Sequence, residues 1–221
     1  IWLHVDAAYA GTALLLPEYQ WMIRGIDLAD SFVFNPHKWM FTNFDCSVYL
    51  VKDAGVLIRT FEILPEYLKT KTRGAVNDYR DWGVPLGRRF RALKLWFVIR
   101  SYGLEGIRDK LRAHSRMNKH FSIELQKTAS IHLPMEPFLN FSCFRLQPDG
   151  MEEKDALNRL NEAFLEEINN SGKLFLTHTK INGILTLRML IGQTYVEESD
   201  VEQALEIINA AASETLKKEI I

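Results

Sequence analysis

The chain has 221 residues with an apolar fraction of 47%, which is enough for a core in one large domain or two small ones. Its 27 basic and 28 acidic residues nearly cancel, which argues against nucleic acid or an anionic membrane as the main partner. The two cysteines, Cys46 and Cys143, lack a metal-ligand spacing, and no apolar run approaches the roughly 20 residues of a membrane span. We therefore expect a cytoplasmic, metal-free globular protein that binds a small neutral or zwitterionic ligand.

The first part of the chain alternates predicted strands with helix-length segments. Residues 1–6 read as a buried strand that is already under way at the first residue, which suggests a piece of a longer protein. Pro17 begins a predicted helix that ends near Gly25, and strands follow at 31–35 and 46–51. This order predicts an α/β domain with a mostly parallel or mixed sheet. The polar stretch 69–77 is predicted to be a mobile loop.

A long helical pattern then runs from Leu86 to about Leu111, and the texture of the sequence changes after it. The elements predicted beyond it are a helix at 114–127, a strand at 141–147, a helix at 152–170, strands at 173–178 and 184–191, and a helix at 197–218. We predict two domains, residues 1–110 and residues 111–221, the second being a small α+β lobe.

Two side chains of opposite charge follow predicted strands. Asp6 ends the first strand, and Lys38 follows the second within Asn35-Pro36-His37-Lys38-Trp39. Ligands of α/β sheets bind at the carboxyl ends of strands, although Asp6 alone could be a helix cap and Lys38 alone a surface lysine. One ligand that uses both is pyridoxal phosphate (PLP), because its aldehyde condenses with a lysine amine and its ring nitrogen needs an anionic partner. Partial burial beside Trp39 would favour the neutral amine that this reaction needs.

Four motifs resemble the group II PLP-dependent amino acid decarboxylases, and among these the aromatic L-amino acid decarboxylases that act on DOPA, tyrosine or tryptophan. They are HVDAAYAG (4–11), DSFVFNPHKW (30–39), NFDCS (43–47) and DYRDWGVPLGRRFRALKLWF (78–97). The resemblance is strong to about residue 115 and thins beyond it. It implies the fold type I of PLP-dependent transferases, with residues 1–110 as the latter part of the large PLP-binding domain, incomplete at its N-terminus, and residues 111–221 as the C-terminal domain.

The resemblance also implies roles for single residues. Lys38 would form the Schiff base with PLP, Asp6 would pair with the ring nitrogen, and Ala8 would lie against one face of the ring. Asn35 and His37 would contact the cofactor or its phosphate, with His37 also counted among the catalytic residues. Phe44 and Gly87 are expected near the bound substrate. Relatives that act on histidine tend to carry serine at the position of Gly87, so glycine favours a larger aromatic side chain.

Tyr67 bears on which reaction follows. A phenol on a closing loop can protonate the α-carbon, and thus the quinonoid, after carbon dioxide leaves. In relatives that form aldehydes this position resembles phenylalanine, so Tyr67 favours simple decarboxylation. The resemblance further implies a homodimer in which the Tyr67 loop acts across the interface.

The sequence thus predicts a PLP-dependent carboxy-lyase that converts an aromatic L-amino acid into its amine and carbon dioxide. Two alternatives stay open: an aromatic aldehyde synthase, and a non-catalytic fragment that lacks the phosphate site. The basic run from Arg88 to Lys94 is interleaved with apolar residues and reads as a packed helix rather than a nucleic acid site. The scattered histidines, His114 among them, are expected to pack or to lie on the surface.

Overall fold

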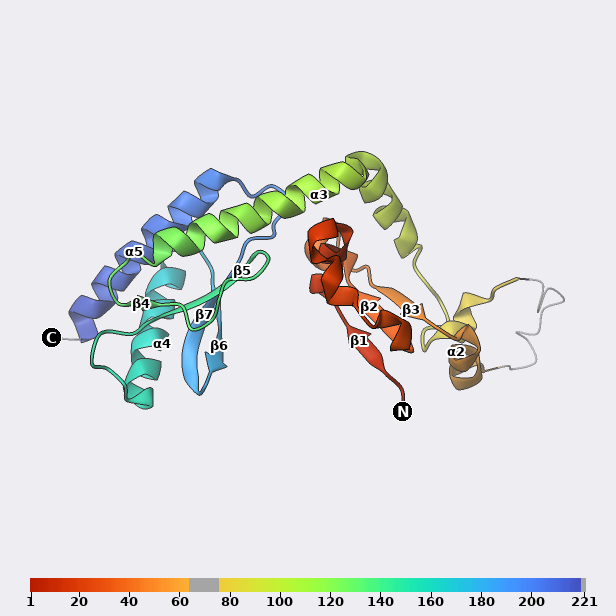
Figure 1. Cartoon of the computed structure of the whole chain (residues 1–221), viewed down its shortest axis with the longest axis horizontal. Coiled ribbons are helices and arrows are strands. Elements are labelled where there is room, and N and C mark those ends of the chain that lie inside the picture. The colour runs from red at the N-terminus through yellow and green to blue at the C-terminus, as the bar shows by residue number, and fades with distance from the viewer. Residues whose placement is uncertain (64–75, 220–221) are drawn as a thin grey trace. The chain divides into compact units, whose positions relative to one another are not determined.

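A computed structural model of the chain describes residues 1–63 and 76–219, and these form two compact units, Ile1–Ile107 and Arg108–Ile221 (Figure 1). The predicted boundary between residues 110 and 111 and the observed one both fall within the same long helix. Among the described residues, no helix combines the length and the apolar character needed to cross a membrane.

The first unit is built on a three-stranded sheet in the order β1-β2-β3, with β1 at His4–Asp6, β2 at Ser31–Phe34 and β3 at Val48–Val51. β1 and β2 run parallel, and β3 runs antiparallel to β2. The sheet is therefore mixed, which is one of the two forms predicted from the sequence, the other being a mostly parallel sheet. The parallel pair is joined by a crossover, which is what parallel strands require.

The crossover between β1 and β2 contains three 3-10 helices, η1 (Ala10–Leu15), η2 (Pro17–Ile23) and η3 (Ile26–Leu28). The helix predicted from Pro17 to about Gly25 is present as the 3-10 helix η2, which ends two residues earlier, at Ile23. Gly25 has φ 83°, a left-handed conformation, and it precedes η3 and so separates it from η2. Gly11 allows close packing on the sheet, because a Cβ there would lie 2.5 Å from the Cβ of Phe34.

After the crossover, the described residues of the first unit form the helices α1 (Pro36–Trp39), α2 (Ala54–Phe61), η5 (Tyr79–Trp82) and the start of α3 (Arg91–Leu125). α2 was not predicted, although Asp53 caps it by accepting a hydrogen bond from the Gly55 amide at 2.8 Å. The sequence predicted the interruption of the long helix between residues 111 and 114. The structure places it at Gly103, whose φ of 65° and ψ of 174° are not helical, so that prediction was wrong.

The second unit packs helices against an antiparallel sheet in the order β4-β5-β7-β6. Its elements are β4 (Ile131–His132), β5 (Phe141–Leu146), α4 (Lys154–Asn170), β6 (Thr177–Ile181), β7 (Ile184–Leu190) and α5 (Glu198–Glu219). The predicted strand at 173–178 was displaced, since β6 begins at Thr177. Asn182 and Gly183, with φ of 53° and 82°, form the two-residue turn that fixes the β6–β7 register.

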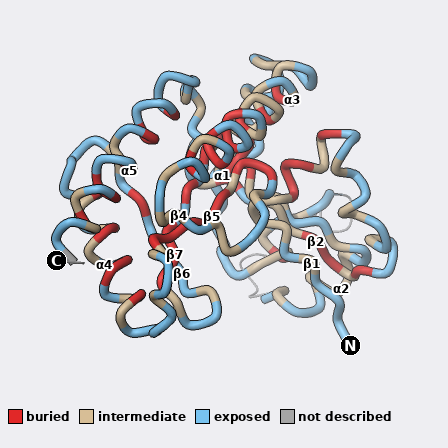
Figure 2. The backbone as a smooth tube through the Cα atoms, turned by 60° about the vertical axis from the view of Figure 1, so that its left-hand side comes forward, coloured by how far each residue is buried: buried red, intermediate tan, exposed pale blue. Residues whose placement is uncertain are grey.

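The core of the second unit lies between β5, β7 and the helices, and Figure 2 shows the buried stretches of β5 and β7 in red. Phe121, Phe144 and Phe164 are fully buried there and stack edge to face, with ring centroids 5.9 and 6.2 Å apart. Asn161 is also fully buried and satisfies the backbone of β5, because its amide accepts from the Leu146 N–H and donates to the Leu146 carbonyl.

Candidate active site

One face of the first sheet carries polar side chains together with Val33 and Val51, and the opposite face is apolar. Alternate residues of a strand point to opposite faces, so His4 and Asp6 share a face with Ser31. The contact between His4 Nδ1 and Ser31 Oγ, at 2.7 Å, agrees with this register. Val5 and Phe32 face the other way, toward the 3-10 helices.

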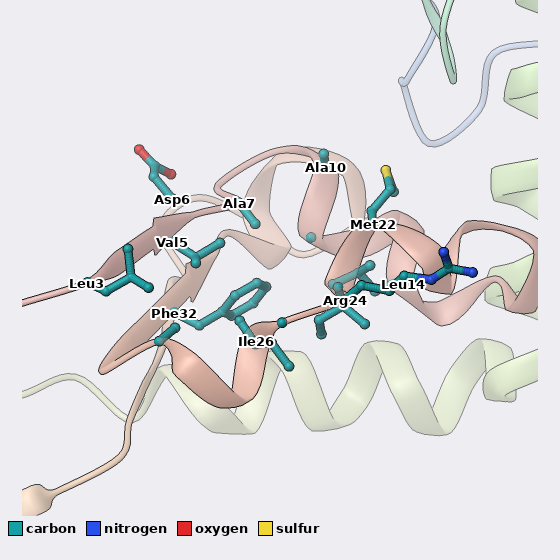
Figure 3. A pocket seen from close by; sticks show the side chains of 14 residues that line it. Leu3, Val5, Asp6, Ala7, Ala10, Leu14, Met22, Arg24, Ile26 and Phe32 are labelled. Carbon is teal, nitrogen blue, oxygen red and sulfur yellow. The ribbon is translucent and has the colours of Figure 1, made fainter.

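The apolar face borders a pocket of about 230 Å³ between β1, β2 and the crossover (Figure 3). Its side chains are almost all aliphatic or aromatic, with Arg24 as the basic exception. In Figure 3 the Asp6 carboxylate points away from the Phe32 ring and from the pocket interior. The pocket therefore offers apolar contact and does not bring together the polar residues predicted for the site.

Asp6 lies at the carboxyl end of β1, beside Val33 of β2. Its Oδ1 accepts a hydrogen bond from the Ala8 amide at 3.0 Å, and the Ala8 carbonyl accepts one from the Asn35 amide at 3.0 Å. The ends of the two strands are thus hydrogen-bonded neighbours. The carboxylate is exposed and has no cationic partner within the described ranges 1–63 and 76–219.

Lys38 lies on α1, the single helical turn that follows β2, with Pro36 at its first position. Trp39 is fully buried and stacks on Tyr9, with ring centroids 5.4 Å apart and planes 9° apart, whereas the Lys38 side chain is exposed. The expected burial of Lys38 beside Trp39 was therefore wrong. Consecutive helical side chains point about 100° apart, so a buried Trp39 turns Lys38 outward. Within the part of the chain that the structure describes, the lysine amine has no ion-pair partner.

His37 and Asn35 are held by the loop that precedes β3. His37 Nδ1 lies 2.7 Å from the Cys46 carbonyl oxygen and 3.0 Å from its amide nitrogen, so Cys46 anchors the ring in either tautomer. Ser47 Oγ donates a hydrogen bond to Asn35 Oδ1 at 2.7 Å. Burial raises the pKa of the Cys46 thiol, which keeps it protonated and unreactive.

Asp45, in the same loop, forms an ion pair with Arg91 at the start of α3. Arg91 Nε lies 3.1 Å from Oδ1 and a terminal guanidinium nitrogen lies 3.1 Å from Oδ2, so the contact is bidentate. The hydrogen bond from Arg91 lowers the pKa of the Asp45 carboxyl below its usual value. Asp45, Cys46 and Ser47 belong to the NFDCS motif, but the sequence alone does not indicate which residues they contact.

The other residues predicted for the site make fewer contacts with the ends of β1 and β2, or lie outside the described residues. Phe44 is 84% exposed, and its ring lies 4.9 Å from the His37 ring in an edge-to-face contact, which puts it beside α1. Gly87 is exposed, and a Cβ there would meet no described atom within 4 Å. Tyr67 and most of the predicted loop at 69–77 lie outside the described residues.

The chemistry of this site follows from its two charged groups. A primary amine and a carboxylate stand at the carboxyl ends of adjacent parallel strands, and each lacks an ion-pair partner among the described residues. Such a pair can hold a molecule with an electrophilic carbonyl at one end and a basic nitrogen at the other. No group of three or more metal-ligating side chains occurs in ranges 1–63 and 76–219.

Comparison with known proteins supports this chemistry. The family model described as the pyridoxal-dependent decarboxylase conserved domain matches residues 1–147. The chain is 46% identical over 220 residues to phenylacetaldehyde synthase of Arabidopsis thaliana, covering 99% of this chain and 45% of that protein. It is 42% identical over 214 residues to aromatic-L-amino-acid decarboxylase of Drosophila lebanonensis, covering 97% of this chain and 51% of that protein.

Solved structures give the same result. The chain is similar to the structure of Oryza sativa TDC with PLP and tryptamine, with a TM-score of 0.91 and 34% sequence identity. The match covers 96% of this chain and 44% of the Oryza sativa chain. This likeness confirms the predicted α/β fold. The chain spans about half the length of the curated relatives it matches.

Proposed function

We propose that this chain, which belongs to the pyridoxal-dependent decarboxylase family, supplies the lysine and the ring-nitrogen partner of an enzyme that decarboxylates an aromatic L-amino acid to its amine. Membership in the family confirms the resemblance predicted from the HVDAAYAG and NPHKW motifs, and PLP is the cofactor of that family. The observation that carries the proposal is the parallel pairing of β1 with β2, because it brings the end of the Asp6 strand beside the residues that lead into Lys38.

The residues present fit PLP by their chemistry. In the proposed site, Lys38 would hold the cofactor covalently through its amine, and Asp6 would keep a proton on the ring nitrogen. When bound, the cofactor supplies an electron sink for the carbanion that remains after loss of carbon dioxide. Ala8 would leave room for one face of the ring, and Asn35 and His37 would contact the cofactor or its phosphate.

Lys38 and Asp6 depend on different parts of the chain for their placement. Asp6 is oriented by the Ala8 amide, and α1 is anchored by buried Trp39. Since the carboxylate is exposed and the amine is exposed, both groups are accessible to a ligand from outside the described unit. No ion pair joins these two side chains among the described residues, so neither charge is already neutralised by the other.

We assign the final protonation to Tyr67, whose hydroxyl would donate a proton to the α-carbon of the product. This assignment rests on the sequence alone, because Tyr67 lies outside the described residues. The relatives include both decarboxylases and aldehyde synthases, at 42% and 46% identity, so their names do not decide between the two reactions. The tyrosine hydroxyl is the feature that favours decarboxylation.

We further propose a cytoplasmic homodimer in which the Tyr67 loop acts on the partner's site. Buried, unbridged Cys46 and Cys143 agree with a reducing compartment. Mixing a Lys38→Ala protein with a Tyr67→Phe protein tests the dimer directly. If the loop acts across the interface, mixed dimers regain amine formation at one of the two sites, whereas sites complete within one subunit would give no recovery.

The central experiment uses the full-length protein that carries this chain. After incubation with PLP and reduction with borohydride, we expect a fixed adduct on the Lys38 peptide, and an adduct elsewhere would refute the assignment. A panel of tyrosine, DOPA, tryptophan and 5-hydroxytryptophan is then assayed for amine, aldehyde, ammonia and hydrogen peroxide. Amine without peroxide supports the decarboxylase, and aldehyde formed in step with peroxide supports the aldehyde synthase.

The non-catalytic alternative is tested with the 221-residue chain itself. The chain is mixed with PLP alone, and separately together with a segment that covers the portion of the relatives it does not span. An adduct at Lys38 only in the second mixture identifies an incomplete enzyme. An absence of adduct in both mixtures favours a non-catalytic role.

A further inference from the structure

The position of Lys38 needs support from outside its own helix. α1 has only four residues, and a single helical turn is not stable by itself because nucleation costs more than one turn of hydrogen bonds returns. Within the turn, the Lys38 amide donates to the Asn35 carbonyl at 2.9 Å. The placement of the lysine backbone therefore follows the placement of Asn35 and of the turn as a whole.

Two groups of contacts hold this turn. On its far side, buried Trp39 stacks on Tyr9. On its near side, the segment Asp45–Ser47 contacts the residues that lead into the lysine. The backbone carbonyl and amide of Cys46 both lie against the His37 ring nitrogen, and the Ser47 hydroxyl donates to the Asn35 side chain. The near-side contacts are polar and directional, so they depend on the exact position of Asp45–Ser47.

The segment Asp45–Ser47 precedes β3 and is not part of the sheet ladder, since β3 begins at Val48. Its main side-chain tie to the rest of the unit is the bidentate ion pair between Asp45 and Arg91, which joins residues 46 positions apart. The Cys46 sulfur also lies 3.9 Å from the Arg91 carbonyl oxygen. The segment is therefore attached to the first residue of α3 by two neighbouring residues.

We infer that Asp45 and Arg91 are positioning residues for Lys38: their ion pair holds the segment Asp45–Ser47, and that segment sets the turn from which the lysine projects. The inference rests on the proposed function of Lys38. Neither residue touches the reacting atoms in this assignment. A bidentate guanidinium–carboxylate pair fixes distance and angle together, which a single-point contact does not.

The test uses the full-length protein with Asp45→Asn, with Arg91→Gln, and with both changes. Arg59→Gln is the matched control, because Arg59 pairs with Asp53 in the same unit through one contact of 3.4 Å and is more exposed. The readouts are the rate of borohydride-fixable adduct formation at Lys38, the separate values of kcat and KM, and the unfolding temperature without cofactor.

We expect each single change to slow adduct formation and to lower kcat by about tenfold or more, because small displacements of a reacting group carry costs of that order. KM changes less than kcat, and the unfolding temperature stays close to that of the control. The double variant should be no slower than either single one, because both remove the same interaction. Arg91→Lys keeps the positive charge but cannot make the bidentate contact, so its adduct rate and kcat should lie between those of the wild type and Arg91→Gln.

Three results would overturn the inference: adduct rates equal to those of Arg59→Gln, single effects that multiply in the double variant, or losses that follow the unfolding temperature. If Asp45→Asn fails to fold, Arg91→Lys decides by the same criteria. Failure of this inference is distinct from failure of the proposed function. A wild-type protein without any adduct at Lys38 refutes the function, whereas a normal wild-type adduct with unaffected variants refutes only the positioning role.

Discussion

The two units differ in the extent of their apolar cores: the second unit holds one large cluster of buried side chains, whereas several large apolar side chains of the first unit are exposed. The second unit closes a core around Phe121, Phe144 and Phe164, each fully buried. The first unit leaves Trp96 and Phe97 more than half exposed and carries its charged candidate residues at accessible strand ends. The second unit therefore holds most of the buried core, and the first unit holds the candidate catalytic residues. Changes in the first unit should affect chemistry, and changes in the second should affect folding.

The largest effect is expected from Lys38→Ala. Loss of the amine removes covalent cofactor binding, so the adduct and the activity should both fall below detection, while exposed Lys38 contributes little to stability. Mass spectrometry of the borohydride-treated protein measures the first quantity and thermal unfolding the second. Lys52→Ala is the control, since Lys52 follows β3, which runs antiparallel to β2 and ends at the opposite end of the sheet. Equal loss in both variants would contradict the assignment.

The converse change is Phe164→Ala in the second unit. Removing a fully buried phenylalanine that packs on Phe144 should lower the free energy of unfolding by about 3 to 5 kcal/mol. Denaturant titration followed by circular dichroism measures it. Phe175→Ala, at a position 78% exposed, should change the free energy of unfolding far less. Similar losses in the two variants would show that the second unit does not hold an independent core.

A pH effect should also come from the second unit. Burial lowers the pKa of His114 from 6.5 to about 4, with the nearby charge of Lys110 acting in the same direction. Between these values the unfolded chain binds a proton that the folded chain does not, so stability is fully present above pH 6.5 and declines as the pH falls toward 4. The loss amounts to about 3 kcal/mol.

Unfolding titrations between pH 4 and 7 measure this slope. His114→Gln should flatten it, while His178→Gln, at an exposed position of β6, should leave it as in the wild type. A slope that survives the His114 substitution would assign the proton uptake to another group.

The smallest effect is expected from Gly87→Ser. The added side chain meets no described atom within 4 Å, so stability should change by less than about 0.5 kcal/mol. If Gly87 borders the substrate, the ratio of kcat/KM for tryptophan over histidine should fall by a few-fold to about tenfold. Paired assays on the two amino acids measure the ratio. An unchanged ratio would remove Gly87 from the substrate site.

The sequence predicted the strongly periodic elements best. The predicted helix at 152–170 and the observed α4, Lys154–Asn170, differ only at the start, because the amphipathic pattern there is decided by burial along one face. The predicted strand at 173–178 was displaced, because the apolar residues of that stretch include Phe175, which is exposed and lies before β6 begins at Thr177. The short helices η1, η3 and α1 were not predicted, because short elements depend on tertiary contacts more than on local pattern.

For the candidate site, the pairing of the strands was predictable from the sequence, but the polar contacts around Lys38 were not. The parallel pairing that brings the Asp6 and Asn35 backbones together follows from the strand–crossover–strand order of the sequence. The bond from Ser47 to Asn35 and the pair between Asp45 and Arg91 were not predictable, because polar contacts between distant residues leave no periodic signal. The outward direction of Lys38 was missed for a related reason: adjacency to Trp39 in sequence does not imply adjacency in packing.

The three-stranded sheet of the first unit has a further consequence for handling the protein. In the described chain, β1 and β3 each present one row of backbone amides and carbonyls that no strand covers, and Leu50 of β3 adds an exposed apolar side chain. Open edges of this kind are templates for intermolecular β-pairing. The 221 residues produced alone should therefore aggregate as concentration rises, and co-expression with a segment able to add a strand should suppress that aggregation.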